Sequence, residues 1–199
     1  MKPQAFVFIG RSGSGKGTQA KHLTEALNKK YPGAPVHHVE TGAELRKFVK
    51  GDSYTAKLSK SIIDSGRFMP EFMPIYLWAD ILVKNYNGDG FIIFDGTPRK
   101  LMEAKALDSL FPFYELGKPW VIYLDIEHEE SIKRLTNRGE GRKDDTPAGI
   151  ESRRAEYEVN VKPTVEWYKT NPNVNFLDVD GERPIDVIHA DIVKRIGLE

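Results

Sequence analysis

One segment near the N-terminus constrains the fold more than any other. Gly10 to Thr18 reads Gly-Arg-Ser-Gly-Ser-Gly-Lys-Gly-Thr, and it follows an apolar run from Phe6 to Ile9. After it comes a helix-like stretch with Ala20, Leu23 and Leu27 on one side. Glycines allow backbone N–H groups to turn inward around a phosphate, and the N-terminus of a helix adds its positive end. We therefore predict a phosphate-binding loop between a strand and a helix.

The loop also supplies charged and hydroxyl groups. Lys16 would neutralise the outer phosphates of ATP or GTP. The strict motif places Ser or Thr directly after the lysine, whereas here Gly17 intervenes and Thr18 supplies the hydroxyl on the Mg²⁺ side. The predicted nucleotide-binding residues of the loop are Gly10, Ser12, Gly13, Ser14, Gly15, Lys16, Gly17 and Thr18.

The rest of the chain alternates strand-like and helix-like segments. Apolar runs recur at Val36 to Val39, Phe91 to Phe94, Trp120 to Leu124 and Val174 to Val179, which predicts an α/β fold with a five-stranded parallel sheet covered by helices. Pro184 is expected at the first position of the last helix, which carries Ile185, Ile188, Ile192 and Ile196. Trp78, Trp120 and Trp167 are expected to pack in the core, and Pro163 to kink a helix.

Two segments interrupt this alternation. About fifty residues of mostly helical pattern separate the second and third strands, more than one crossover helix requires, which indicates an inserted lobe. The stretch from Asn137 to Pro147 is rich in glycine and charge and predicts a mobile loop, ending where Thr146 caps a helix that starts with Pro147.

Composition excludes several classes of protein. The 29 basic and 29 acidic residues cancel, so no overall positive field would gather nucleic acid or anionic membrane. The absence of cysteine excludes disulfides, a thiol nucleophile and a cysteine-ligated zinc site. No apolar stretch reaches membrane-spanning length and the first residues do not form a signal peptide, so we expect a cytoplasmic protein, and a monomer.

Further motifs make the nucleotide class specific. Besides Gly-Lys-Gly-Thr, the chain has Thr41-Gly42-Ala43-Glu44-Leu45-Arg46, Gly66-Arg67-Phe68-Met69-Pro70-Glu71, Asp95-Gly96-Thr97-Pro98-Arg99 and an arginine-rich stretch from Arg134 to Arg153. In this order and spacing the chain resembles the adenylate kinase family over nearly its whole length. The resemblance implies a P-loop kinase core (1–39, 70–136 and 148–199), a helical monophosphate-binding lobe (40–69) and a short lid (137–147).

The resemblance also implies an activity and a set of site residues. The reaction would be reversible, Mg²⁺-dependent transfer of a phosphoryl group from ATP to AMP, giving two ADP. Catalytic roles fall to Lys16, Arg99, Arg138, Arg142 and Arg153, with Arg134 and Arg138 on ATP. AMP would contact Thr41, Gly42, Arg46, Arg67, Phe68, Met69, Gly96, Arg99, Glu103, Arg142 and Arg153.

The arginines suit this chemistry, because planar guanidinium groups can hold a transferring phosphoryl group in line between donor and acceptor. Asp95, at the end of the third strand, would hold Mg²⁺ through water together with Thr18. Asp144 and Asp145 would either pair with lid arginines or cap the helix at Thr146. The five histidines form no catalytic pattern.

Position 103 departs from the family. Adenylate kinases typically place Gln there to read adenine, whereas this chain has Glu103. A carboxylate only accepts hydrogen bonds, which suits the two adjacent donors of guanine, so AMP with weakened base discrimination, GMP, or UMP and CMP remain open as acceptors. Alternatively, Glu103 lies on an exposed helix face and meets no base. Thr97 replaces a Phe, and Ala43 stands where Asp is frequent, changes expected to affect packing more than chemistry.

Other nucleotide-binding classes fit less well. A regulatory GTPase needs a guanine-reading Asn-Lys-x-Asp segment, which is absent, and a motor ATPase would place Glu rather than Gly96 after Asp95. A non-catalytic nucleotide-binding module of the same fold is the remaining alternative.

Overall fold

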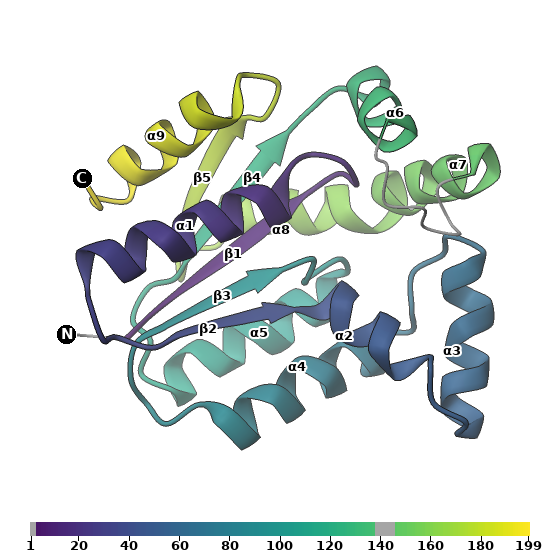
Figure 1. The fold of residues 1–199 in the computed structure, drawn as a ribbon, viewed down its shortest axis with the longest axis horizontal. Coiled ribbons are helices and arrows are strands. Elements are labelled where there is room, and N and C mark those ends of the chain that lie inside the picture. The colour runs from purple at the N-terminus through teal and green to yellow at the C-terminus, as the bar shows by residue number, and fades with distance from the viewer. Residues whose placement is uncertain (1–2, 138–145) are drawn as a thin grey trace.

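The computed structural model describes residues 3–137 and 146–199. In these ranges the chain forms a five-stranded sheet in the order β2-β3-β1-β4-β5, with all neighbouring strands parallel (Figure 1). The strands are β1 (Gln4–Gly10), β2 (Val36–Glu40), β3 (Phe91–Asp95), β4 (Trp120–Asp125) and β5 (Asn175–Asp180). The predicted α/β class and the five predicted strands are confirmed, with ends that differ by a few residues at most.

Helices connect and cover the strands. They are α1 (Lys16–Lys30), α2 (Thr41–Phe48), α3 (Tyr54–Asp64), α4 (Phe72–Asn85), α5 (Leu101–Phe113), α6 (His128–Thr136), α7 (Pro147–Glu156), α8 (Lys162–Thr170) and α9 (Ile185–Arg195), with a π-helix, η1 (Tyr157–Val161), between α7 and α8. Between β2 and β3 the chain forms α2, α3 and α4, as the long helical stretch predicts. None of the described helices has the length and apolarity needed to cross a bilayer.

Two hydrophobic cores lie on opposite faces of the sheet. Alternate residues of β1 separate them: Ala5, Val7 and Ile9 face one core, and Phe6 and Phe8 face the other. The first core is covered by α4, α5, η1 and α8, and the second by α1 and α9, which lie side by side in Figure 1. Trp78 is buried in the first core, and Trp120 and Trp167 pack at the edges of the cores, as predicted.

The carboxyl ends of the strands meet at one edge of the sheet. Asp95, at the end of β3, pairs in register with Phe8 of β1 and with Glu40 of β2. The turns that lead from β1, β2 and β3 into the following helices therefore leave the sheet side by side. In open parallel sheets this edge is where ligands bind.

Several helix ends differ from the sequence prediction. Thr146 caps α7 through a 3.1 Å bond from Gly149 N, as expected. Pro184 is the residue before α9 rather than its first residue, because its ψ of 145° is extended. Pro163 lies at the start of α8, so the irregularity in this long helix falls in η1, directly before it.

Candidate active site

The phosphate loop depends on glycine where the backbone approaches a neighbour or turns left-handed. A side chain at Gly10 would place its Cβ 2.5 Å from the carbonyl oxygen of Leu124 on β4, so the loop can leave the sheet only without one. Gly15, at the N-cap of α1, has a φ of 93°, in the left-handed region that favours glycine. These glycines bring the start of α1 to the carboxyl edge of the sheet.

Lys16 curls back over the loop. Its Nζ donates to the carbonyl oxygens of Gly10 at 3.0 Å and Arg11 at 2.6 Å. The ammonium group is thereby held at the mouth of the loop. An anion bound there would meet both this charge and the N-terminus of α1.

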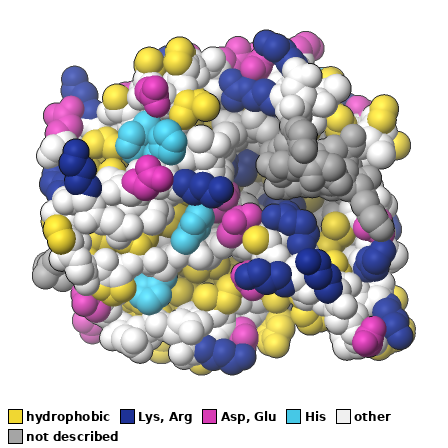
Figure 2. All heavy atoms as spheres, in the orientation of Figure 1, with side chains coloured by type: hydrophobic (Ala, Val, Ile, Leu, Met, Phe, Trp, Pro, Cys, Tyr) yellow, Lys and Arg dark blue, Asp and Glu magenta, His cyan; other side chains and the backbone are white. Residues whose placement is uncertain are grey.

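A cavity of about 310 Å³ opens in front of the loop. Figure 2 shows dark blue Lys and Arg side chains gathered where this face of the molecule is hollowed. The predicted site residues that line the cavity are Ser12, Gly13, Gly15, Lys16, Gly17, Thr18, Thr41, Gly42, Arg46, Arg67, Phe68, Met69, Asp95, Gly96, Arg99, Glu103 and Arg153. Segments far apart in the sequence thus converge on one space.

Four arginines in the described part of the chain line this cavity: Arg67, from the segment before α4, and three others. Arg46 comes from α2, Arg99 from the loop before α5, and Arg153 from α7. Arg99 donates from Nε to the carbonyl oxygen of Gly96 at 2.9 Å, and its guanidinium lies 4.9 Å from the centre of the Phe68 ring.

Burial lowers the pKa of Arg99, the carboxylates of Glu103 and Asp95 act to raise it, and the positive charges of Arg46 and Arg153 act to lower it. Arginine nevertheless stays protonated in proteins. Positive charges that repel one another in a partly desolvated cavity are stabilised by a bound anion. The electrostatics of the cluster therefore favour phosphate.

Asp95 supplies a carboxylate beside this positive cluster. Its side chain is buried at the end of β3, and a Cβ on Gly17 would lie 3.0 Å from its Oδ2, so glycine lets the carboxylate reach the start of α1. A carboxylate and the hydroxyl of Thr18 are the oxygen donors that Mg²⁺ prefers. Among the described residues no cluster of three or more His, Cys, Asp or Glu could cage a metal. The donors fit a magnesium ion that takes its remaining ligands from water and phosphate.

Glu103 is buried rather than exposed. Its side chain lines the cavity with 2% of the residue's surface exposed, so the alternative of an exposed helix face is wrong. Its Oε2 accepts hydrogen bonds from Thr97 Oγ1 at 2.9 Å and from the backbone N–H of Arg99 at 3.0 Å. Burial raises the pKa of Glu103, while these two donors act to lower it.

The sequence predicts that Thr97 affects packing more than chemistry, and the structure adds a polar contact to that expectation. Its hydroxyl is fully buried and bonds directly to the Glu103 carboxylate. A phenylalanine could not make this bond, so the two departures from the family motif form one interacting pair.

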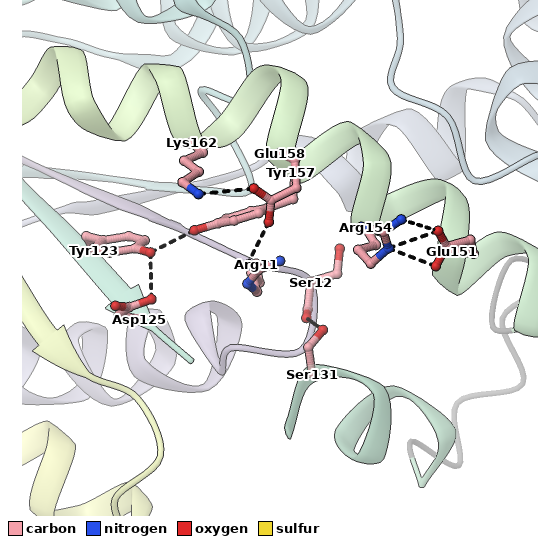
Figure 3. Close-up of polar contacts among 10 residues, drawn as sticks. All are labelled: Arg11, Ser12, Tyr123, Asp125, Ser131, Glu151, Arg154, Tyr157, Glu158 and Lys162. Atoms are coloured by element: carbon pink, nitrogen blue, oxygen red, sulfur yellow. Dashed lines mark hydrogen bonds and ion pairs between the residues drawn. The ribbon is translucent and has the colours of Figure 1, made fainter. Parts of the chain in front are cut away.

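Arg11 is a loop residue whose role the sequence did not indicate. Its guanidinium lies 3.8 Å from the centre of the Tyr157 ring, and its Nη2 donates to Glu158 Oε1 at 2.9 Å (Figure 3). Tyr157 Oη lies 2.7 Å from the hydroxyl of Tyr123, which donates to Asp125 Oδ1 at 2.6 Å. These contacts tie the loop to η1 and to the end of β4.

Comparison with known proteins agrees with this geometry. The sequence profile of the family described as adenylate kinase matches residues 8–173. The chain belongs to the adenylate kinase family. It is 32% identical over 192 residues to an adenylate kinase of Phocaeicola vulgatus, covering 96% of each chain.

Other relatives agree over the same length. An adenylate kinase of Prochlorococcus marinus is 33% identical, covering 96% of this chain and 97% of the relative, and one of Leptospira biflexa is 34% identical, covering 96% and 98%. This adenylate kinase family member is accordingly a nucleoside monophosphate kinase, a phosphotransferase.

The structure does not place every predicted site residue of this kinase at the cavity. Arg138 and Arg142, with Asp144 and Asp145, fall outside the described residues. Arg134 does not line the 310 Å³ cavity; its Nε donates to Glu130 Oε1 at 2.7 Å on α6.

Two loop residues are also absent from the cavity lining. They are Gly10, which lines a second, smaller cavity together with Lys16 and Arg99, and Ser14, which is 1% exposed.

Glu40 and Lys21 line the cavity without having been predicted. Only their positions in the sequence could have indicated this, because Glu40 is the last residue of β2 and Lys21 lies five residues after Lys16 on α1.

Proposed function

We propose that this kinase transfers the γ-phosphoryl group of ATP to AMP, reversibly, giving two ADP. The observation that carries the proposal is the convergence of Lys16, Arg46, Arg99 and Arg153 on one cavity in front of the phosphate loop. Four positive groups from four separate segments of the chain exceed what a single triphosphate needs, but they suit two phosphate tails that meet head to head.

The loop would hold the donor nucleotide. Backbone N–H groups from Gly13 to Thr18 would cradle its phosphates, with Lys16 on the outer ones. Asp95 and Thr18 would hold Mg²⁺ through its water shell. The ion supplies charge neutralisation of the phosphates when it is bound.

The acceptor would lie on the side of α2. Arg46 and Arg99 would bind its phosphate, and Arg153 would reach the group in transfer. The Thr41 hydroxyl is buried without a hydrogen-bond partner among the described residues, and Thr41 lines the cavity, which supports a place for it beside the acceptor base. Gly42, Arg67, Phe68, Met69 and Gly96 would complete this subsite.

No side chain is required as a general base. The acceptor phosphate is already largely ionised near neutral pH, since its second pKa is about 6. The protein's contribution is therefore orientation of the two phosphates and stabilisation of the charge that spreads over the phosphoryl oxygens. Arg134, Arg138 and Arg142 would add to this positive field, with 137–147 acting as a short lid over the core and the lobe at 40–69.

Replacement of the loop lysine tests the proposal. Lys16→Met should lower kcat for ADP formation from ATP and AMP by about 100-fold or more, the size of effect seen when one electrostatic donor is removed. Lys29→Met, an exposed change in the last turn of the same helix, should leave the rate unchanged. Unimpaired turnover in Lys16→Met would refute the role, and nucleotide binding without turnover by the unaltered protein would favour a non-catalytic module.

The setting of the enzyme is part of the same proposal. Absence of cysteine fits a reducing cytoplasm, and the balanced charge gives no attraction to nucleic acid or to anionic membranes. ATP and AMP are the proposed partners of a monomer.

A further inference from the structure

The Glu103 carboxylate is fixed by bonds to one of its two oxygens. Glu103 is the third residue of α5, and Oε2 accepts from the Thr97 hydroxyl and from the Arg99 N–H, at 2.9 and 3.0 Å. Thr97 is 0% exposed and Glu103 2%, so water has little access to either bond. The orientation of the carboxylate is therefore set by the protein before any nucleotide binds.

The other oxygen, Oε1, has no donor in the part of the chain that the structure describes. Glu103 nevertheless lines the same cavity as Thr41, whose buried hydroxyl also has no partner among the described residues. Leu45, Ile63 and Pro74 line this cavity as well. Apolar walls with a few unsatisfied polar groups are typical of a site for a flat, partly polar ligand such as a nucleobase.

Charge determines what Glu103 can recognise. Burial, the largest effect, raises the pKa of Glu103, while the two donors on Oε2 and the nearby cations Arg99 and Lys100 lower it and so stabilise the ionised form against burial. An ionised carboxylate only accepts hydrogen bonds. Oε1 can take the N6 amine of adenine, and it can equally take the adjacent N1–H and N2 amine of guanine. It offers no donor to the N1 lone pair of adenine.

A glutamine at this position would recognise the base differently. The Thr97 hydroxyl and the Arg99 N–H would both require an acceptor, so the amide oxygen would face them and the NH₂ group would face the cavity. That NH₂ group would donate to N1 of adenine and would oppose the N1–H of guanine. With the same two donors in place, a glutamine would therefore select adenine over guanine, whereas the glutamate accepts both bases.

We propose that Glu103, oriented by Thr97, is a specificity-determining residue that admits GMP as a second acceptor beside AMP. The inference rests on the proposed function, because it assigns the base-reading side of the same acceptor site. Thr97 acts through Glu103 and is a positioning residue.

The test compares kcat/KM for AMP and GMP at pH 8 in four proteins: unaltered, Glu103→Gln, Thr97→Val and Glu44→Gln. We expect the unaltered enzyme to phosphorylate GMP within about 20-fold of AMP, and Glu103→Gln to raise the AMP to GMP ratio by about tenfold or more, since a buried group left facing a like donor is strongly rejected. Glu44→Gln is the matched control, because Glu44 pairs with Lys47 at 2.6 Å and does not line the cavity.

Thr97→Val keeps the shape of the side chain and removes the hydroxyl. It should change the AMP to GMP ratio, because the carboxylate then keeps only one of the two donors that orient it. Binding of AMP and GMP, measured by calorimetry, gives a second readout if either variant turns over poorly. If Glu103→Gln does not fold, Thr97→Val carries the test.

The outcomes separate the two proposals. AMP turnover with a ratio that neither Glu103→Gln nor Thr97→Val alters would overturn the role of Glu103 and leave the proposed function standing. GMP turnover below one hundredth of AMP in the unaltered enzyme would do the same. Turnover of neither nucleotide would overturn the proposed function itself, and this inference with it.

Discussion

The contact between the phosphate loop and the π-helix should contribute measurably to stability. Arg11 makes a charge-assisted hydrogen bond to Glu158 at 2.9 Å and lies over the Tyr157 ring at 3.8 Å. The Arg11 side chain is 15% exposed and that of Glu158 36%, so solvent screens part of the ion pair. We expect the pair to be worth about 0.5–1 kcal/mol and the cation–π contact about as much again.

Replacement of each partner gives the expected magnitudes. Glu158→Gln should cost about 0.5–1 kcal/mol and Arg11→Met about 1–2 kcal/mol, because the second change removes both contacts. The coupling energy between the two positions should be about 0.5–1 kcal/mol, smaller than the sum of the single effects. For a chain of this size each kcal/mol lowers Tm by about 2–4 °C.

A double-mutant cycle measured by urea unfolding at pH 7 checks these values. Glu166→Gln is the control, since Glu166 pairs with Lys169 on the exposed face of α8 and should have no effect beyond error. A coupling energy of zero between Arg11 and Glu158 would refute the reasoning.

The same coupling should depend on pH. The Arg11 hydrogen bond holds the pKa of Glu158 below its ordinary value of 4.5. A carboxylate with a depressed folded pKa contributes stability that is fully present above the unfolded pKa and is lost as pH falls through the folded one. The coupling should therefore be constant from pH 7 to about 5 and decline at lower pH.

Three further substitutions test the acceptor side of the cavity, a histidine on α9 and the N-cap of α7. Glu40 Oε1 pairs with Arg46 Nη2 at 3.2 Å in the cavity, so Glu40→Gln should free this arginine and lower the KM for AMP by about two- to fivefold. An unchanged or higher KM would show that the carboxylate does not compete with phosphate for Arg46. Burial and the neighbouring His22 lower the pKa of His189 from 6.5. A histidine whose pKa is depressed in the folded state loses its stabilising contribution as the pH falls below the pKa of the unfolded state. Between pH 8 and pH 5.5 the Tm should therefore drop more in the unaltered protein than in His189→Gln, and equal drops would contradict this. Thr146→Ala removes the N-cap of α7 and should destabilise the protein by about 1 kcal/mol in urea unfolding, with no change expected for Thr146→Ser.

The sheet and the loop could be predicted because their signals are local. Each strand is a short apolar run, and Gly10 to Thr18 has its recognisable pattern between a strand and a helix. Parallel strands then place Asp95 beside the loop, since their carboxyl ends share one edge of the sheet. The convergence of Lys16 and Asp95 therefore follows from topology.

Contacts that depend on side-chain direction could not be predicted. Glu103 could equally have faced solvent, because one turn of helix leaves its direction open until Thr97 and Arg99 are placed around it. The interaction of Arg11 with Glu158 joins residues 147 positions apart, and no periodicity in the sequence indicates it.

The π-helix could not be predicted from the sequence for a similar reason. Tyr157–Val161 has an ordinary helical pattern in the sequence, and the contacts of Tyr157 with Tyr123 and Arg11 join residues far apart in the chain. Pro163 pointed to an irregularity in this region but not to its place.

The central claim is that two nucleotides meet with their phosphates inside the ring formed by Lys16, Arg46, Arg99 and Arg153. A crystal structure with two adenosines joined through five phosphates tests it most directly. We predict that the phosphate chain runs from the loop at Lys16 to Arg99, with Arg153 beside its middle. A chain bound away from Lys16 and these guanidinium groups would contradict the account.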